Sequence, residues 1–165
     1  MSSISIRTPH LADRPLIAKV LEDAFEAPDE AQLVQSLIDG NNVVLELIAL
    51  LDGVIAGHIL FSRLRVEGNT VFEAVALAPL SVAPEHQGKG IGSALIKAAH
   101  EQLIAAGETL AVVLGDPGYY GRFGYTREQA LGFTSPYQGE YLQAQAFGDA
   151  PTSGTLIYAP AFGAL

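Results

Sequence analysis

The sequence contains no cysteine and few basic residues. Without cysteine the protein cannot form a disulfide framework or a thiolate zinc site, and a transferred group cannot pass through a cysteine-bound intermediate. Nine Lys and Arg against 18 Asp and Glu give a net charge of -9. A surface of that sign repels phosphate backbones, so we do not expect nucleic acid as a partner. The excess of acid either keeps the protein soluble or attracts a cation such as an amine.

Long apolar runs are also missing. The run from Val43 to Leu51 falls far short of the ~20 residues that a membrane helix needs. The N-terminal MSSISIRTPHLADR has no apolar segment behind a basic start, so it does not resemble a secretory signal. We therefore expect a cytoplasmic protein without a membrane partner. The chain of 165 residues is 49% hydrophobic and 16% charged, which fits one globular domain over residues 1–165.

Periodicity predicts a mixed α/β fold. Helices are expected between Asp13 and Pro28, from Asp29 to Asp39, and from Ile91 to Gly107. Strands are expected at residues 3–7, 43–50, 54–65, 71–82, 110–114, 141–147 and 154–158. The strands before and after the third helix should pair in parallel through a right-handed crossover.

Pro79 lies inside the expected strand 71–82. Because proline has no N–H for the ladder, this strand should bulge or lack a partner there. The backbone near residues 80–82 would then be free to bind a ligand.

The stretch PEHQGKGIG (Pro84 to Gly92) places three glycines within five positions, between a strand and a helix. Glycines allow a sharp turn whose N–H groups and helix start suit a phosphate or pyrophosphate, although a plain tight turn has the same appearance. A P-loop is excluded because Ala83 stands where its first glycine belongs and Gly90 follows Lys89. A dinucleotide fingerprint would need glycine at position 93 or 95, which hold Ser and Leu.

The segment Gln87-Gly88-Lys89-Gly90-Ile91-Gly92 resembles the Q/R-x-x-G-x-G/A signature of the GNAT superfamily of N-acyltransferases. Three further segments, GHILFS, VLGDPGYYGRFGY and GTLIYAPAF, resemble an uncharacterised bacterial branch of predicted N-acetyltransferases. The resemblance covers most of the chain. It implies an acyl-CoA N-acyltransferase fold, in which helices flank a mixed, partly splayed sheet of six or seven strands.

The resemblance also implies where acetyl-CoA binds. The donor would lie where strands 71–82 and 110–114 separate, with the pantetheine arm against the backbone of Leu80, Ser81 and Val82. One N–H there would polarise the thioester carbonyl. The pyrophosphate would be wrapped by Gln87, Gly88, Lys89, Gly90, Ile91, Gly92 and Ser93.

Two catalytic residues follow from the same resemblance. Tyr120, in a Y-x-x-x-G-[FY] arrangement, would protonate the departing thiolate, with Tyr119 as the competitor; alternatively, both tyrosines only pack the loop. Glu73 would be the general base, acting directly or through water; alternatively, it is only a solvated carboxylate on the strand. His58 is an alternative base, although a lone histidine in GHILFS is also typical of a hydrogen-bonded structural residue.

The function implied is direct transfer of an acetyl group from acetyl-CoA to a primary amine of a small molecule or protein. The alternative is a catalytically weak acyl-CoA-binding sensor or regulatory module. The histidines lack metal-ligand spacing, so no metal is expected. A homodimer formed through the C-terminal strands is a further hypothesis.

Overall fold

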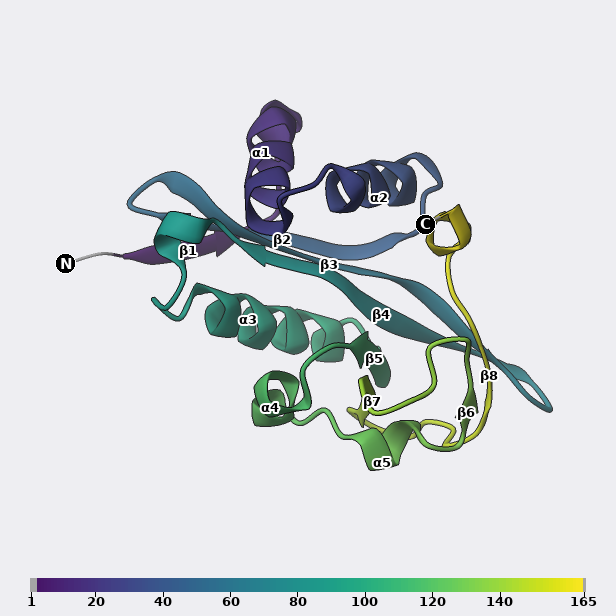
Figure 1. Ribbon diagram of the computed structural model, residues 1–165. Helices are drawn as coiled ribbons and strands as arrows, with labels where there is room; N and C mark the ends of the chain where they lie inside the picture. Colours follow the sequence, from purple (N-terminus) through teal and green to yellow (C-terminus); the bar gives the residue numbers. More distant parts are fainter. Residues whose placement is uncertain (1–2, 165) are drawn as a thin grey trace.

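One mixed sheet separates two layers of helices (Figure 1). The structure is a computed structural model that describes residues 3–164. The strands run in the order β1-β2-β3-β4-β5-β7, and β8 pairs with both β3 and β6. They are β1 (Ile4–Arg7), β2 (Val43–Leu51), β3 (Val54–Glu67), β4 (Val71–Val82), β5 (Leu110–Leu114), β6 (Phe133–Thr134), β7 (Leu142–Ala146) and β8 (Gly154–Ile157).

Helices α1 and α2 cover one face of the sheet, and α3, α4 and α5 lie on the other side (Figure 1). Their bounds are α1 (Arg14–Phe25), α2 (Asp29–Asp39), α3 (Ile91–Ala105), α4 (Pro117–Tyr120) and α5 (Arg127–Ala130). Short 3-10 turns are η1 (Leu11–Asp13), η2 (Pro84–His86), η3 (Gly121–Phe123) and η4 (Pro160–Ala164). The three long helices lie where the sequence predicts them.

Helices α1 and α2 pack on the sheet through apolar stripes at helical spacing. Leu21 and Leu37 are completely buried against Ile48 and Leu60 of the central strands. Because residues three or four apart share one helix face, each helix presents such a stripe to the sheet.

Helix α3 packs on the opposite face through Ile91, Leu95, Ala99 and Leu103, the stripe expected from the sequence. Gly57 of β3 allows this close approach. A Cβ on Gly57 would lie 2.8 Å from Ile91 Cγ2 and 3.0 Å from Leu95 Cδ1. The absence of a side chain at Gly57 therefore lets the start of α3, and the turn before it, pack tightly against the sheet.

The strand β4 bulges at Pro79 and then parts from β5. Ile59 of β3 pairs with Leu80 and Phe61 with Leu77, so one β3 residue faces two β4 residues, Ala78 and Pro79. The parallel ladder between β4 and β5 covers residues 75–77 and 111–113, whereas the ladder between β4 and β3 continues to Val82. The predicted bulge and splay are both confirmed.

The sheet has eight strands, where six or seven were expected. The additional strand is β6, a two-residue segment that pairs in parallel with β8. Two residues are too few to show the period-two alternation by which a strand is recognised in a sequence. Within residues 3–164, no helix combines the length and the apolar character needed to cross a bilayer.

Candidate functional site

A cleft of about 460 Å³ lies where the glycine-rich turn enters α3. We call it the loop cleft; it is lined by Leu80, Ser81, Val82, His86, Gln87, Gly88, Gly90, Ile91, Gly92, Ser93, Tyr119 and Arg122. Nine of the ten residues expected to bind the donor therefore line one cleft. The tenth, Lys89, is exposed outside this lining, with its Nζ 3.5 Å from Nδ1 of His86.

The loop cleft presents backbone N–H groups. Gly88 and Gly90 have φ values of 79° and 80°, in the left-handed region that favours glycine. The first hydrogen bond of α3 runs from Ala94 N to Gly90 O at 3.0 Å, so the N–H groups of residues 91–93 have no acceptor within the helix. Together with the positive end of the helix dipole, these donors form a site suited to an anion.

Basic side chains gather around the loop cleft although the protein is acidic overall. His86 and Arg122 line it, and Lys89 lies beside His86. The Arg122 guanidinium stands 4.8 Å from the Tyr119 ring centroid and 5.3 Å from that of Phe123. These contacts orient the guanidinium next to the cleft and favour a polyanionic ligand.

A second pocket, also of about 460 Å³, lies where β4 and β5 separate. We call it the splay pocket; it is lined by Phe25, Glu30, Leu33, Ala76, Leu77, Ala78, Pro79, Leu80, Val112, Val113, Leu114, Tyr120, Tyr137, Tyr158 and Phe162. Leu80 lines both pockets. They therefore meet at the first β4 residue beyond the bulge.

The two tyrosines of α4 face different pockets. Tyr119 lines the loop cleft and Tyr120 lines the splay pocket, with their rings edge to face at 5.0 Å between centroids. Each ring rests against a glycine, because a Cβ on Gly92 would clash with the Tyr119 hydroxyl and one on Gly115 with the Tyr120 ring. Burial, followed by the neighbouring Tyr119, raises the pKa of Tyr120 to about 12. Tyr120 is therefore protonated at neutral pH and can donate a proton.

Residues 5–127 match the family model described as the acetyltransferase (GNAT) domain. The chain belongs to the GNAT acetyltransferase family. The uncharacterized N-acetyltransferase YjhQ of Escherichia coli K12 is 36% identical over 137 residues, which cover 79% of this chain and 76% of YjhQ. Both the family and the enzyme class expected from the sequence, an acetyl-CoA-dependent N-acetyltransferase, are confirmed.

Solved structures of GNAT acetyltransferases have the same fold. A GNAT family acetyltransferase from Brucella melitensis, solved in complex with acetyl-CoA, is 34% identical with a TM-score of 0.83, covering 97% of this chain and 98% of that one. The E. coli protein YhbS, solved in complex with CoA, is 28% identical with a TM-score of 0.86, covering 98% and 92%. The mixed, splayed α/β fold expected from the sequence is thus confirmed.

A buried polar pair supports the tyrosine loop of this acetyltransferase. Tyr125, completely enclosed, places its hydroxyl 2.9 Å from Nε2 of His100 on α3, and its ring lies 6.1 Å from that of Tyr120. Burial lowers the pKa of His100 to about 4. The imidazole is therefore neutral at neutral pH and links α3 to the loop that holds Tyr120.

Glu73 does not lie at either pocket of the acetyltransferase. Its side chain is 63% exposed and pairs with Nε of Arg63 at 3.3 Å. Arg63 also binds the Glu108 carboxylate through both terminal nitrogens, at 3.0 and 2.9 Å. Glu73 precedes Pro79 by six residues, which span roughly 20 Å of extended strand. Its ion pair with Arg63 holds the Glu73 side chain on the surface of the sheet. The structure therefore gives no support to Glu73 as the base.

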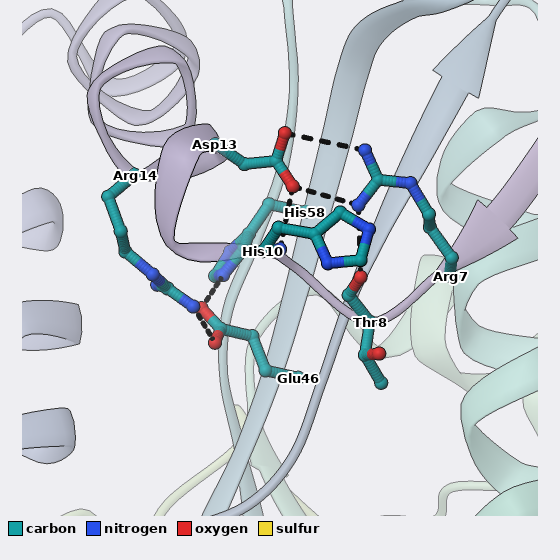
Figure 2. Close-up of polar contacts among 7 residues, drawn as sticks. All are labelled: Arg7, Thr8, His10, Asp13, Arg14, Glu46 and His58. Atoms are coloured by element: carbon teal, nitrogen blue, oxygen red, sulfur yellow. Dashed lines mark hydrogen bonds and ion pairs between the residues drawn. The ribbon is translucent and has the colours of Figure 1, made fainter.

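His58, the alternative base, is completely buried in a polar network of the acetyltransferase core (Figure 2). Its Nε2 lies 2.7 Å from Oε2 of Glu46, which also accepts a 2.8 Å bond from Nη1 of Arg14. Burial alone would raise the pKa of Glu46, but the bonds from Arg14 and His58 bring it down to about 2. His58 lines neither pocket, so its contacts fit a structural role that ties α1 to the sheet.

Several site residues could not be found from sequence motifs. Glu30 and Tyr137 come from segments without a family signature. Tyr158 and Phe162 lie in GTLIYAPAF, which resembles the family but assigns them no role, and only the folded chain brings all four together at the splay pocket. Arg122 did carry a signal, because it stands two residues after Tyr120 in GYYGRFGY. Among the described residues no group of three or more potential metal ligands occurs.

Proposed function

We propose that the loop cleft binds the diphosphate of acetyl-CoA and that the thioester lies where β4 and β5 separate. The N–H groups of residues 91–93, the left-handed glycines and the nearby basic side chains support the first part. The bulge at Pro79, which ends the β4–β5 ladder, supports the second, because a splayed strand has backbone groups free to pair with the pantetheine arm.

The chemistry is a direct transfer to a primary amine. The neutral amine nitrogen attacks the thioester carbonyl carbon and the carbon–sulfur bond breaks. Tyr120 gives its proton to the leaving thiolate, and the proton that nitrogen loses returns to the phenolate. The products are the N-acetyl amine and free CoA thiol, with no net change in protons. A bound ammonium must first release one proton to solvent.

One observation carries this assignment. The tyrosine pair is divided between two pockets that share Leu80, so a donor in the loop cleft and an acceptor in the splay pocket would meet beside Tyr120. Burial, followed by the neighbouring Tyr119, raises the pKa of Tyr120 to about 12, so its hydroxyl keeps its proton at neutral pH. Tyr119, on the donor side, is placed to contact the cofactor instead.

Free-thiol release from acetyl-CoA in the presence of an amine panel tests the proposal. We expect Tyr120→Phe to lower kcat by about 100-fold or more, the range for loss of a general acid, with the Kd for acetyl-CoA changed less than about threefold. The matched control is Tyr119→Phe, which removes the neighbouring hydroxyl and should leave most of kcat. A comparable loss of kcat in Tyr119→Phe would transfer the acid role. Tight binding of acetyl-CoA without release by any amine would favour the acyl-CoA sensor.

Some expectations from the sequence stay predictions. These are a single domain over residues 1–165, a cytoplasmic location, the absence of a nucleic-acid partner and assembly as a homodimer. Of the C-terminal strands, β8 is already paired on both sides, and β7, which pairs with β5, also forms a bridge between Ala144 and Thr126. A homodimer would thus use a surface other than the ladder of β8.

A further inference from the structure

The lining of the splay pocket differs in chemistry from that of the loop cleft. It consists of aliphatic and aromatic side chains, three tyrosines and one carboxylate, that of Glu30 on α2. Among these described lining residues there is no Lys, Arg or His. An acceptor that carries its own carboxylate, such as an amino acid, would find no basic partner there.

The aromatic side of the pocket is built from rings that contact one another. Tyr137, Tyr158 and Phe162, which we call the aromatic wall, stack edge to face with centroid distances of 5.1 and 5.8 Å. Ser135 ties the wall together, because its Oγ lies 3.3 Å from the Tyr158 hydroxyl and accepts a 3.1 Å bond from the Tyr137 N–H. A preformed aromatic surface of this kind binds an apolar group with little loss of conformational entropy.

The end of α1 and the start of α2 also line the pocket. Phe25 is 38% exposed, and Glu30 is half-buried. A carboxylate facing a largely apolar pocket favours a cationic group on the ligand. The net charge of -9 acts in the same direction over longer distances.

We propose that the acetyl acceptor is a small primary amine on an apolar body about the size of an aromatic ring. The body packs on the aromatic wall and Glu30 attracts the ammonium group. The thioester would take the part of this pocket between β4 and β5, and the amine the part lined by the aromatic wall and Glu30. This inference rests on the proposed function, because it assigns the acceptor to the pocket that Tyr120 faces. A longer acyl chain on the donor would also fit an apolar pocket, but it would leave Glu30 without a partner.

The decisive measurement compares kcat/KM across amines in the thiol-release assay. The apolar monoamines are 2-phenylethylamine and isoamylamine, and the polar acceptors are spermidine, a lysine peptide, L-alanine and kanamycin. We expect the apolar monoamines to exceed the polar acceptors by at least about tenfold, the discrimination that a single buried hydrocarbon group supplies. A polar acceptor used equally well would overturn the inference and leave the transferase assignment intact.

Variants connect that preference to the pocket. Tyr137→Ala should raise the KM for 2-phenylethylamine at least about fivefold, and Tyr137→Phe, which keeps the ring, should recover most of the loss. Glu30→Gln should raise the same KM, whereas the exposed Glu22→Gln on α1 removes the same charge away from the pocket and serves as its matched control. An equal effect of both charge changes would show that Glu30 has no specific contact with the amine.

Two further experiments distinguish a failure of this inference from a failure of the proposed function. Calorimetric titration of 2-phenylethylamine into the CoA complex should show binding that Tyr137→Ala weakens at least about fivefold, even if no thiol is released. Binding of 2-phenylethylamine without thiol release would contradict the transferase assignment alone. Thiol release with polar amines, without binding of 2-phenylethylamine, would contradict the inference alone. Replacing acetyl-CoA by hexanoyl-CoA should lower the rate, and a higher rate would assign the aromatic wall to the acyl chain.

Discussion

The two pockets that meet at Leu80 are built in opposite ways. The loop cleft is formed mainly by one continuous stretch, residues 80–93, whose backbone supplies the donors. The splay pocket is formed by side chains from α1, α2, β4, β5, α4 and the C-terminal segment. A ligand common to many enzymes can be held by main chain that varies little in chemistry, whereas a particular acceptor needs side chains that can change one by one.

Because the two pockets differ in this way, substitutions in one pocket should have other effects than substitutions in the other. A change in the backbone of the loop cleft should affect the donor and leave the chemistry of the splay pocket untouched. A change in the aromatic wall should do the reverse. Tyr120, together with the Tyr125 ring that lies near it, connects the loop cleft and the splay pocket.

The largest effect is expected from Gly90→Val. A Cβ at Gly90 would meet no heavy atom within 4 Å, so the cost lies in the φ of 80°, which a β-branched residue disfavours. Relaxation of this angle would turn N–H groups away from the diphosphate. Loss of two charge-assisted hydrogen bonds corresponds to about a 100-fold rise in the Kd for acetyl-CoA, which calorimetry can measure.

The matched control for Gly90→Val is Gly107→Val at the other end of α3. Gly107 has a φ of 88° and also has open space around its Cβ direction. Both variants should lose a similar free energy of unfolding, about 1–2 kcal/mol, but only Gly90→Val should lose the donor. Equal affinity in the two variants would mean that the donor diphosphate binds elsewhere.

A smaller effect is expected from protonation of His100, which supports the tyrosine loop from α3. Burial holds its pKa at about 4, below the value near 6.5 of an exposed histidine. As the pH falls from about 6.5 to about 4, the unfolded chain binds the proton first, so stability is lost across this window. We expect a loss of about 1–2 kcal/mol in the free energy of unfolding, allowing for partial exposure of the ring.

Urea unfolding at pH 7.0, 5.5 and 4.5 checks the pH effect. His100→Gln should have a flatter dependence of stability on pH, whatever its stability at pH 7. Removal of the exposed His10 by His10→Gln is the control and should leave the wild-type slope unchanged. If His100→Gln keeps the full slope, another group is responsible for the loss.

The contrast between the pockets also explains what the sequence can predict. The glycines between a strand and a helix leave a contiguous pattern that predicts a tight turn, and the family resemblance in that turn implies that Gln87 to Ser93 bind the donor. Pro79 predicts the bulge because it lacks an N–H. The aromatic wall depends on where β8 and the segment after it return to the sheet. That is decided by long-range pairing such as Val66 with Leu156, which leaves no local pattern.

The expectation for Glu73 as the base stays a prediction, and its exposed ion pair with Arg63 does not support it. A carboxylate on the strand that leads to the bulge resembles a candidate base in the sequence, although it stands six residues before Pro79. Its pairing with Arg63 appears only when the register between β3 and β4 is known.

The smallest effect is therefore expected from Glu73→Gln. Because its side chain is 63% exposed and outside both pockets, kcat/KM should stay within about twofold of wild type, and the lost surface ion pair should cost no more than about 0.5 kcal/mol of stability. Glu30→Gln removes an equal charge inside the splay pocket. Comparing kcat/KM of Glu30→Gln with that of Glu73→Gln therefore distinguishes a contact with the amine from an effect of the protein's net charge. A tenfold loss of kcat in Glu73→Gln, with KM unchanged, would return the base to β4 and break the division between a backbone-built donor site and a side-chain-built acceptor site.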